Sequence, residues 1–288
     1  MFFRVQALAD AVAAGLRERG WVDGRNLAIE VVNKFTEESL PQALVAALAR
    51  EPEVIVIATP FFIAAAAKVT RRTPIVGIDL ESDPVAAGFA RSLARPGGNV
   101  TGIWLDLPEL GGKNAQLLRE LVPGLSSIGA LWDERQGPVQ FNALQTAARA
   151  AGFTLHSAPL REPGEIEGAI ERLKRDGARA LVGFTGSFTF LNRERIVQAA
   201  LKQRLPLASL FTNYPDAGAL LAYGPNVPDM FRQSASHVDR ILRGAKPAEI
   251  PIERPVKFEL IINAVTAKKL GIVIPETLRI RADRIIDV

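Results

Sequence analysis

The stretch VIVIATPFFIAAAAKVTRRTPIVGIDLESDP, residues 54–84, decides the fold class. It contains one pattern twice: an apolar run rich in β-branched residues, a small polar residue followed by proline, and then a helix-like segment. The two turns fall at Thr59-Pro60 and Asp83-Pro84. Unbroken β-branched runs are typical of parallel strands that are covered on both faces. The stretch therefore predicts an α/β fold in which strands and helices alternate.

The alternation continues along the chain and restarts after Pro123-Gly124. Two such runs in 288 residues predict two α/β lobes with parallel sheets. We expect strands at 26–33, 54–58, 74–79, 99–103, 127–133, 153–160, 180–184, 205–211, 218–224 and 256–263. We expect helices at 5–16, 40–50, 61–69, 85–93, 112–121, 139–151, 165–176, 191–203, 229–243 and 264–270.

Composition excludes several classes of protein. The net charge is only +4, and no run of five Lys or Arg occurs, which argues against nucleic-acid binding. The absence of cysteine excludes disulfides, thiolate metal sites and a cysteine nucleophile. The most apolar stretch, residues 54–67, is shorter than a membrane span and is interrupted by Pro60. The first twenty residues do not have the pattern of a secretory signal.

Motifs for catalysis and cofactors are also absent. ARPGGNVTG, residues 94–102, matches neither glycine-rich nucleotide motif. GFTGSFTF, residues 183–190, has no nucleophile elbow, and neither His156 nor His237 follows a predicted strand end. The acids of DLESDP, residues 79–84, lack the glycine and glutamate of a calcium loop. We therefore expect no catalytic residues, no metal and no cofactor.

Ligands of doubly wound sheets bind beyond the carboxyl ends of the strands, so the loops there are the candidate site. Thr59 is a good helix N-cap and Pro60 a good first helical residue, and a helix N-terminus attracts a carboxylate. A plain capped helix is the alternative. Asp79 or Asp83 could accept an ammonium group, and aromatic residues in these loops suit an apolar ligand body.

Several segments together resemble one family. GLRERGWVDGRNLAIEV, ATPFFIAAAAK, SLARPGGNVTGI, ELGGKNAQLLRELVP and KFELIINAVTAKKLGI, with the segments around them, are similar to the tryptophan/tyrosine-type substrate-binding proteins of ABC transporters. The resemblance covers nearly the whole chain. It implies a type I periplasmic-binding-protein-like fold: two Rossmann-like, doubly wound lobes joined by a hinge.

The resemblance also implies an organisation and a setting. Lobe one would comprise residues 1–123 and 226–250, and lobe two residues 124–225 and 251–288. By comparison with the family, the first strand of lobe one would be missing, because the chain starts with residues that match the helix after this strand. The protein would be periplasmic, a monomer or weak dimer, and would deliver a small solute to ABC permease subunits after hinge closure.

The expected function is thus capture of a small carboxylate solute, an amino acid or an aromatic acid, without chemical change. Two alternatives remain: a two-lobed α/β enzyme, or the effector-sensing domain of a regulator. The residues expected to contact the ligand are Thr59, Pro60, Phe61, Asp79, Ser82, Asp83, Thr101, Trp104, Asp133, Thr185, Ser187, Phe211 and Tyr223.

Overall fold

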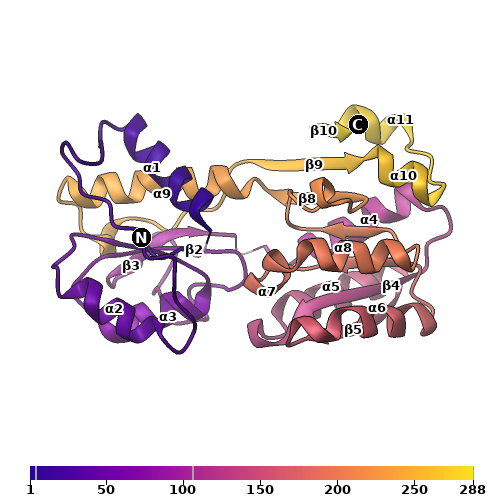
Figure 1. Cartoon of the computed structure of the whole chain (residues 1–288), viewed down its shortest axis with the longest axis horizontal. Coiled ribbons are helices and arrows are strands. Elements are labelled where there is room, and N and C mark those ends of the chain that lie inside the picture. Colours follow the sequence, from indigo (N-terminus) through magenta and orange to yellow (C-terminus); the bar gives the residue numbers. More distant parts are fainter. Residues whose placement is uncertain (4, 106, 288) are drawn as a thin grey trace. The chain divides into compact units, whose positions relative to one another are not determined.

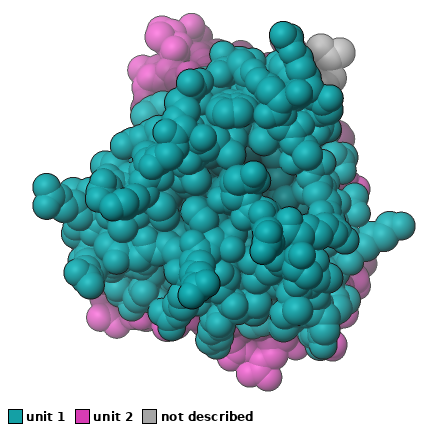
Figure 2. Space-filling view, turned by 90° about the vertical axis from the view of Figure 1, so that its left-hand side faces the viewer, with its two compact units in different colours: residues 1–106, 227–257 teal, residues 107–226, 258–288 magenta. Residues whose placement is uncertain are grey.

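The computed structural model describes residues 1–3, 5–105 and 107–287, and it divides into two compact units. Unit 1 comprises Met1–Asp106 and Val227–Lys257, and unit 2 comprises Leu107–Asn226 and Phe258–Val288 (Figures 1 and 2). Both units are α/β, as predicted, and both are discontinuous in sequence.

The boundaries of the units differ from the predicted ones because helix α4 (Leu110–Leu121) packs in unit 2. The amide of its Asn114 donates to the Tyr223 carbonyl at 2.8 Å and accepts from the Tyr223 N–H at 3.1 Å. Gly111 of the same helix lies so close to Phe184 that an added Cβ would be 2.9 Å from the ring. These contacts tie α4 to strands of unit 2.

Unit 1 is built on a parallel sheet in the order β1-β2-β3. Helices α2 and α3 lie on one side of this sheet, and α1 and α9 on the other (Figure 1). The buried face toward α2 and α3 is apolar and includes Ile57, Ile75 and Trp104. The elements are α1 (Gln6–Glu18), α2 (Leu40–Leu48), β1 (Ile55–Ala58), α3 (Pro60–Val69), β2 (Ile75–Asp79), β3 (Val100–Trp104), α9 (Val227–Leu242) and a 3-10 turn, η4 (Pro247–Glu249).

The first residues of the chain lie beside this sheet. Phe2 forms parallel bridges with both Val32 and Ile57, so Met1–Phe3 occupy a strand position next to β1. Met1–Phe3 therefore pair at a position where the sequence analysis expected no strand. The strand predicted at 26–33 is reduced to isolated bridges at Leu27 and Val32.

Unit 2 contains a seven-stranded sheet in the order β10-β9-β8-β7-β6-β4-β5. All pairs are parallel except β8–β9, because the chain passes through unit 1 between these two strands. The sequence analysis predicted parallel sheets and did not foresee this antiparallel pair. The strands are β4 (Ser127–Asp133), β5 (Thr154–Leu160), β6 (Ala180–Gly183), β7 (Leu207–Ser209), β8 (Leu221–Pro225), β9 (Phe258–Asn263) and β10 (Arg284–Ile286). The α-helices are α4, α5 (Val139–Ala151), α6 (Ile166–Arg175), α7 (Ser187–Leu191), α8 (Arg193–Lys202), α10 (Ala264–Leu270) and α11 (Glu276–Arg281), with 3-10 turns η1 (Glu134–Gln136), η2 (Pro163–Glu165) and η3 (Pro215–Ala217).

Two predicted helices differ from the structure. The segment 85–93 forms turns, because Asp83 Oδ1 accepts from the N–H groups of Val85 and Ala86 at 2.7 and 3.2 Å and Gly88 has a φ of 76°. The helix expected at 191–203 begins at Arg193 as α8 and is preceded by the short helix α7, which ends at Leu191. The sequence analysis also missed α11 and β10.

Candidate functional site

In unit 1, the carboxyl ends of the three strands are joined by backbone hydrogen bonds. The Thr59 N–H donates to the Ile78 carbonyl at 2.9 Å, and the Leu105 N–H donates to the Asp79 carbonyl at 2.8 Å. Thr59 has a φ of 74° and a ψ of 144°, a backbone conformation that is strained for a β-branched residue. This turn begins α3 at Pro60.

The start of α3 differs from the prediction in one respect. Thr59 occupies the N-cap position, but its side chain makes no capping hydrogen bond. The next residue but one, Phe61, keeps 55% of its surface exposed, whereas Phe62 is buried in the core. The turn therefore presents an aromatic ring beside the N-terminal amide groups of a helix.

The loop after β2 is organised around a buried carboxyl group. Asp79 Oδ1 accepts from the Glu81 N–H at 2.7 Å and from the Ser82 N–H at 3.3 Å, and Asp79 Oδ2 accepts from the Ser82 hydroxyl. Its carboxyl also hydrogen-bonds with that of Glu81, which is 8% exposed and was missed by the sequence analysis. Desolvation by burial raises the pKa of Asp79. Two adjacent buried carboxyl groups form an environment that favours a positive group.

Replacing Asp79 by asparagine is expected to make the free energy of unfolding depend less on pH in the acidic range. Between the ordinary aspartate pKa and the raised value, the folded chain keeps a proton that the unfolded chain has lost, so stability falls as pH rises through this window. Asparagine does not titrate and removes this contribution. Urea unfolding from pH 4 to 7 measures the difference. If the free energy of unfolding of Asp79→Asn changes with pH as steeply as that of the wild type, the prediction is contradicted. Asp83→Asn, on the same loop, is the control.

Three predicted residues of unit 1 have structural contacts. Asp83 caps its turn and is exposed. Thr101 is fully buried within β3, and its hydroxyl donates to the Ile250 carbonyl at 2.8 Å. Trp104 is fully buried over Gly77, and its indole nitrogen has no hydrogen-bond partner among the described residues. Of the three, only Asp83 reaches the surface of unit 1.

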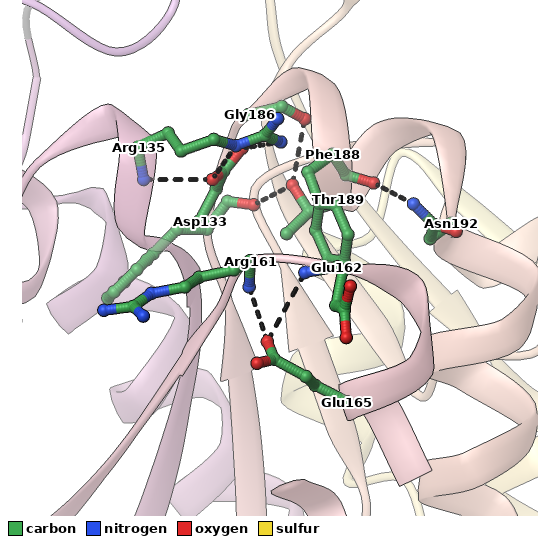
Figure 3. Close-up of polar contacts among 10 residues, drawn as sticks. Asp133, Arg135, Arg161, Glu162, Glu165, Gly186, Phe188, Thr189 and Asn192 are labelled. Carbon is green, nitrogen blue, oxygen red and sulfur yellow. Dashed lines mark hydrogen bonds and ion pairs between the residues drawn. The ribbon is translucent and has the colours of Figure 1, made fainter.

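In unit 2, the loops after β4 and β6 bring an acid, a base and an aromatic ring together (Figure 3). Asp133, at the end of β4, is buried and accepts from Arg135 Nε and Nη2, both at 3.0 Å. The Arg135 side chain remains 48% exposed, and its Cζ lies 5.8 Å from the centre of the Phe188 ring. The buried aspartate thus fixes a guanidinium group at the surface of unit 2.

Hydrogen bonds between Gln140 and Thr185 hold the loop after β6. Gln140 donates to the Thr185 hydroxyl and accepts from the Thr185 N–H at 3.2 Å. Ser187 is half-buried at the start of α7. The hydroxyl of Thr189, in the same helix, donates to the Phe184 and Gly186 carbonyls, both at 3.0 Å. The structure therefore brings Asp133, Thr185 and Ser187 to one edge of the sheet, together with Arg135, which the sequence analysis did not select.

The aromatic predictions of unit 2 lie elsewhere. Phe211 is 2% exposed and packs between Phe190 and Tyr214, with ring centres 5.1 and 6.1 Å away. Tyr223 lies within β8, its backbone is held by Asn114, and its ring is 6.2 Å from that of Phe258. Neither ring is among the groups gathered around Arg135.

Within the described residues, no group of three or more His, Cys, Asp or Glu side chains could hold a metal ion. No helix in residues 1–3, 5–105 and 107–287 combines the length and apolar character that crossing a membrane requires.

The comparisons with known proteins agree with one another. The model of a family described as "ABC transporter substrate binding protein" matches residues 5–286. A tyrosine-binding protein of Clostridioides difficile is 25% identical over 263 residues, covering 88% of this chain and 74% of that protein.

Solved structures share the fold. A crystal structure of a conserved domain protein from Vibrio cholerae has a TM-score of 0.89 at 23% identity, covering 99% of this chain and 97% of that chain. An ABC domain in complex with L-Trp from Streptococcus pneumonia also has a TM-score of 0.89, at 21% identity, with coverage of 99% and 97%. Both confirm the periplasmic-binding-protein-like fold expected from the sequence.

Proposed function

Because this chain belongs to the ABC transporter substrate-binding protein family, we propose that it captures a small amino acid with an aromatic side chain and releases it unchanged to ABC permease subunits. The observation on which this rests is the family match over residues 5–286. The names of relatives agree, since one binds tyrosine and another was solved with L-Trp. Family members act outside the cytoplasmic membrane, and we extend the periplasmic setting to this chain as part of the proposal.

The chemistry of each unit supports an amino acid as the solute. In unit 1, the carboxyl pair of Asp79 and Glu81 suits an ammonium group, and Phe61 suits an apolar body. In unit 2, the half-exposed guanidinium of Arg135 supplies a positive charge that suits a carboxylate. In unit 1 we also include Thr59, Pro60 and Ser82 among the proposed ligand contacts, and in unit 2 we include Asp133, Thr185 and Ser187.

A thermal-shift and calorimetry series tests the proposal. L-Trp and L-Tyr are expected to raise the melting temperature, since a ligand that binds only the folded form stabilises it. Tryptamine lacks the carboxylate and indole-3-propionic acid lacks the ammonium group, so each is expected to bind more weakly than L-Trp. L-Leu controls for the aromatic ring and glucose for non-specific effects. The absence of binding by all amino acids and aromatic acids would contradict the proposal.

Replacing Phe61 by alanine is expected to weaken aromatic amino-acid binding by about 2- to 10-fold, the size of one aromatic contact. Stability should change by less than about 0.5 kcal/mol, because the ring is largely exposed. The matched control is its neighbour: Phe62→Ala removes a core ring and should cost about 3–5 kcal/mol. Calorimetry and urea unfolding separate the two effects. Equal destabilisation by both variants would show that Phe61 is a core residue.

Closure of the units on the solute stays a prediction. A solute that binds one form better than another shifts the population toward it. Small-angle scattering with and without L-Trp measures this shift as a change in radius of gyration.

A further inference from the structure

Four arginine residues lie at the amino-terminal end of the unit 1 sheet, opposite to the loops of the candidate site. Arg71 and Arg72 come shortly before β2, and Arg91 and Arg95 belong to the segment that leads into β3. Because β2 and β3 are parallel neighbours, these two segments meet at the same end of the sheet. We call these four residues the arginine patch.

Hydrogen bonds hold the two segments of the patch together. The side-chain amide of Asn99, just before β3, donates to the Thr70 and Thr73 carbonyls at 3.1 and 2.9 Å. These two carbonyls flank the first arginine pair. The Arg91 N–H donates to the Pro96 carbonyl at 2.9 Å, so the second segment folds back on itself. The backbone that carries the patch is therefore fixed by contacts on both segments.

The four guanidinium groups are exposed, and none of them forms an ion pair or a side-chain hydrogen bond with another residue in the described ranges. Two exposed amines lie beside them, Lys68 in the last turn of α3 and Lys246 before η4, whose Ala248 carbonyl accepts from the second segment at 3.1 Å. Two exposed acids border the patch, Glu53 before β1 and Glu249 in η4, and neither pairs with it. Positive charge is therefore in excess at this end of unit 1.

The positions of other basic residues have a local explanation that the patch lacks. Arg172, Lys174 and Arg175 occupy the last turn of α6, where the helix dipole favours positive charge. Arg195 and Arg232 form ion pairs with acids of other elements. The arginine patch belongs to loops and has no such partner, so the repulsion among its like charges is not compensated within unit 1. A surface of this kind attracts an anionic partner.

The composition of the patch favours one class of anionic partner. A stable protein interface has an apolar core, but no large hydrophobic side chain in residues 70–74 and 91–99 is exposed. Single-stranded nucleic acid stacks on aromatic rings, and neither segment contains one. An anionic bilayer requires charge alone, because each basic residue near its surface adds its own attraction.

We propose that the arginine patch binds the anionic headgroups of a phospholipid bilayer. The planar guanidinium group matches the geometry of a phosphate. Binding is peripheral and reversible, since no exposed apolar side chain of the patch anchors it in the bilayer. The five residues of β2, about 15 Å, separate the patch from the candidate loops, so lipid and solute do not compete for one end of the unit. Retention of the chain beside its permease rests on the proposed function, whereas lipid binding itself does not.

Sedimentation with vesicles tests the proposal, using the full chain without solute. Vesicles of phosphatidylcholine with about 30% phosphatidylglycerol are expected to bind it at least about tenfold more strongly than phosphatidylcholine alone in dilute salt. Screening by about 0.5 M NaCl should remove this difference. Each basic residue contributes roughly a fivefold effect, so Arg71→Gln/Arg72→Gln should weaken binding by about 10- to 30-fold. Its melting temperature and its affinity for L-Trp should stay at the wild-type values, because both side chains are exposed and lie outside the candidate site.

The matched control is Arg149→Gln/Arg279→Gln, which removes two exposed and unpaired arginines of unit 2 and the same net charge. An equal loss of vesicle binding in both double variants would overturn the patch as the site. Tighter binding to a poly-glutamate peptide than to the anionic vesicles would overturn lipid in favour of an acidic protein. Full release from the vesicles by about 10 mM glycerol phosphate would overturn the bilayer in favour of a free phosphate compound. Because no solute is present, failure of vesicle binding is distinct from failure of the proposed solute binding.

Discussion

Replacing Gly102 by alanine is expected to unfold unit 1 and to leave unit 2 folded. Gly102 of β3 pairs with Gly77 of β2 and has a φ of 138°, and an added Cβ would lie 2.0 Å from the Gly77 carbonyl oxygen and 2.8 Å from the Gly77 nitrogen. Both close atoms belong to a backbone that cannot move without breaking the pairing of β2 with β3. The cost should exceed about 4 kcal/mol, a large fraction of the stability of a domain of this size.

The three tryptophans report on the two units separately in an NMR spectrum. Trp21 and Trp104 belong to unit 1, and Trp132 belongs to unit 2, where its indole N–H donates to the Ser157 hydroxyl at 3.0 Å. Gly102→Ala should collapse the dispersion of the first two indole signals and preserve the third. Gly98→Ala is the matched control, since its Cβ would meet nothing within 4 Å. Three unchanged indole signals in Gly102→Ala would refute the expectation.

The fold could be predicted where local pattern and tertiary environment agree. The β-branched runs at 54–58 and 74–79 became β1 and β2, because both strands are buried on both faces. The helix predicted at 139–151 coincides with α5, whose end is marked by Gly152 in the left-handed conformation. In these segments the hydrophobic period and the stop signals point to the same structure.

The pattern failed where a single side chain competes with the helix. The segment 85–93 has helical spacing, but Asp83 binds the first N–H groups, and the Phe89 N–H donates to the Pro84 carbonyl at 2.9 Å. Such local hydrogen bonds offer the backbone an alternative to a helix. The strand expected at 26–33 forms only isolated bridges, one of them between Val32 and Phe2.

The candidate site was predictable at the level of loops only. The carboxyl ends of parallel strands must meet at one edge of a sheet, so the loops at Thr59, Asp79, Asp133 and Thr185 follow from topology. Whether a side chain in these loops is exposed does not follow from topology. Trp104 is buried because its register places it over Gly77, which no local pattern reveals. The spacing of Asp133 and Arg135 directly after a strand was the available signal for Arg135, and it was not used.

Arg135→Ala is expected to weaken the binding of L-Trp or L-Tyr by about 10- to 100-fold. It is also expected to destabilise unit 2, because it leaves the buried Asp133 carboxylate without its guanidinium partner. A charge-assisted hydrogen bond contributes about 1.5–3 kcal/mol, which corresponds to that range in Kd. The guanidinium is half-exposed, but Asp133 holds it at two nitrogen atoms in one orientation. Arg135→Lys keeps the charge and loses the paired donors, so its Kd should lie between those of the wild type and Arg135→Ala.

The matched control for this prediction is Arg161→Ala. Arg161 pairs with Glu134 in the same unit, and its side chain is 70% exposed. Its removal therefore takes away one positive charge from the surface of unit 2. Calorimetry with L-Trp should give a wild-type Kd for Arg161→Ala. A comparison with tryptamine identifies the group that Arg135 binds: if Arg135 contacts the carboxylate, the variant loses affinity for L-Trp and not for tryptamine. An equal loss for both ligands would assign Arg135 to the support of the loop instead.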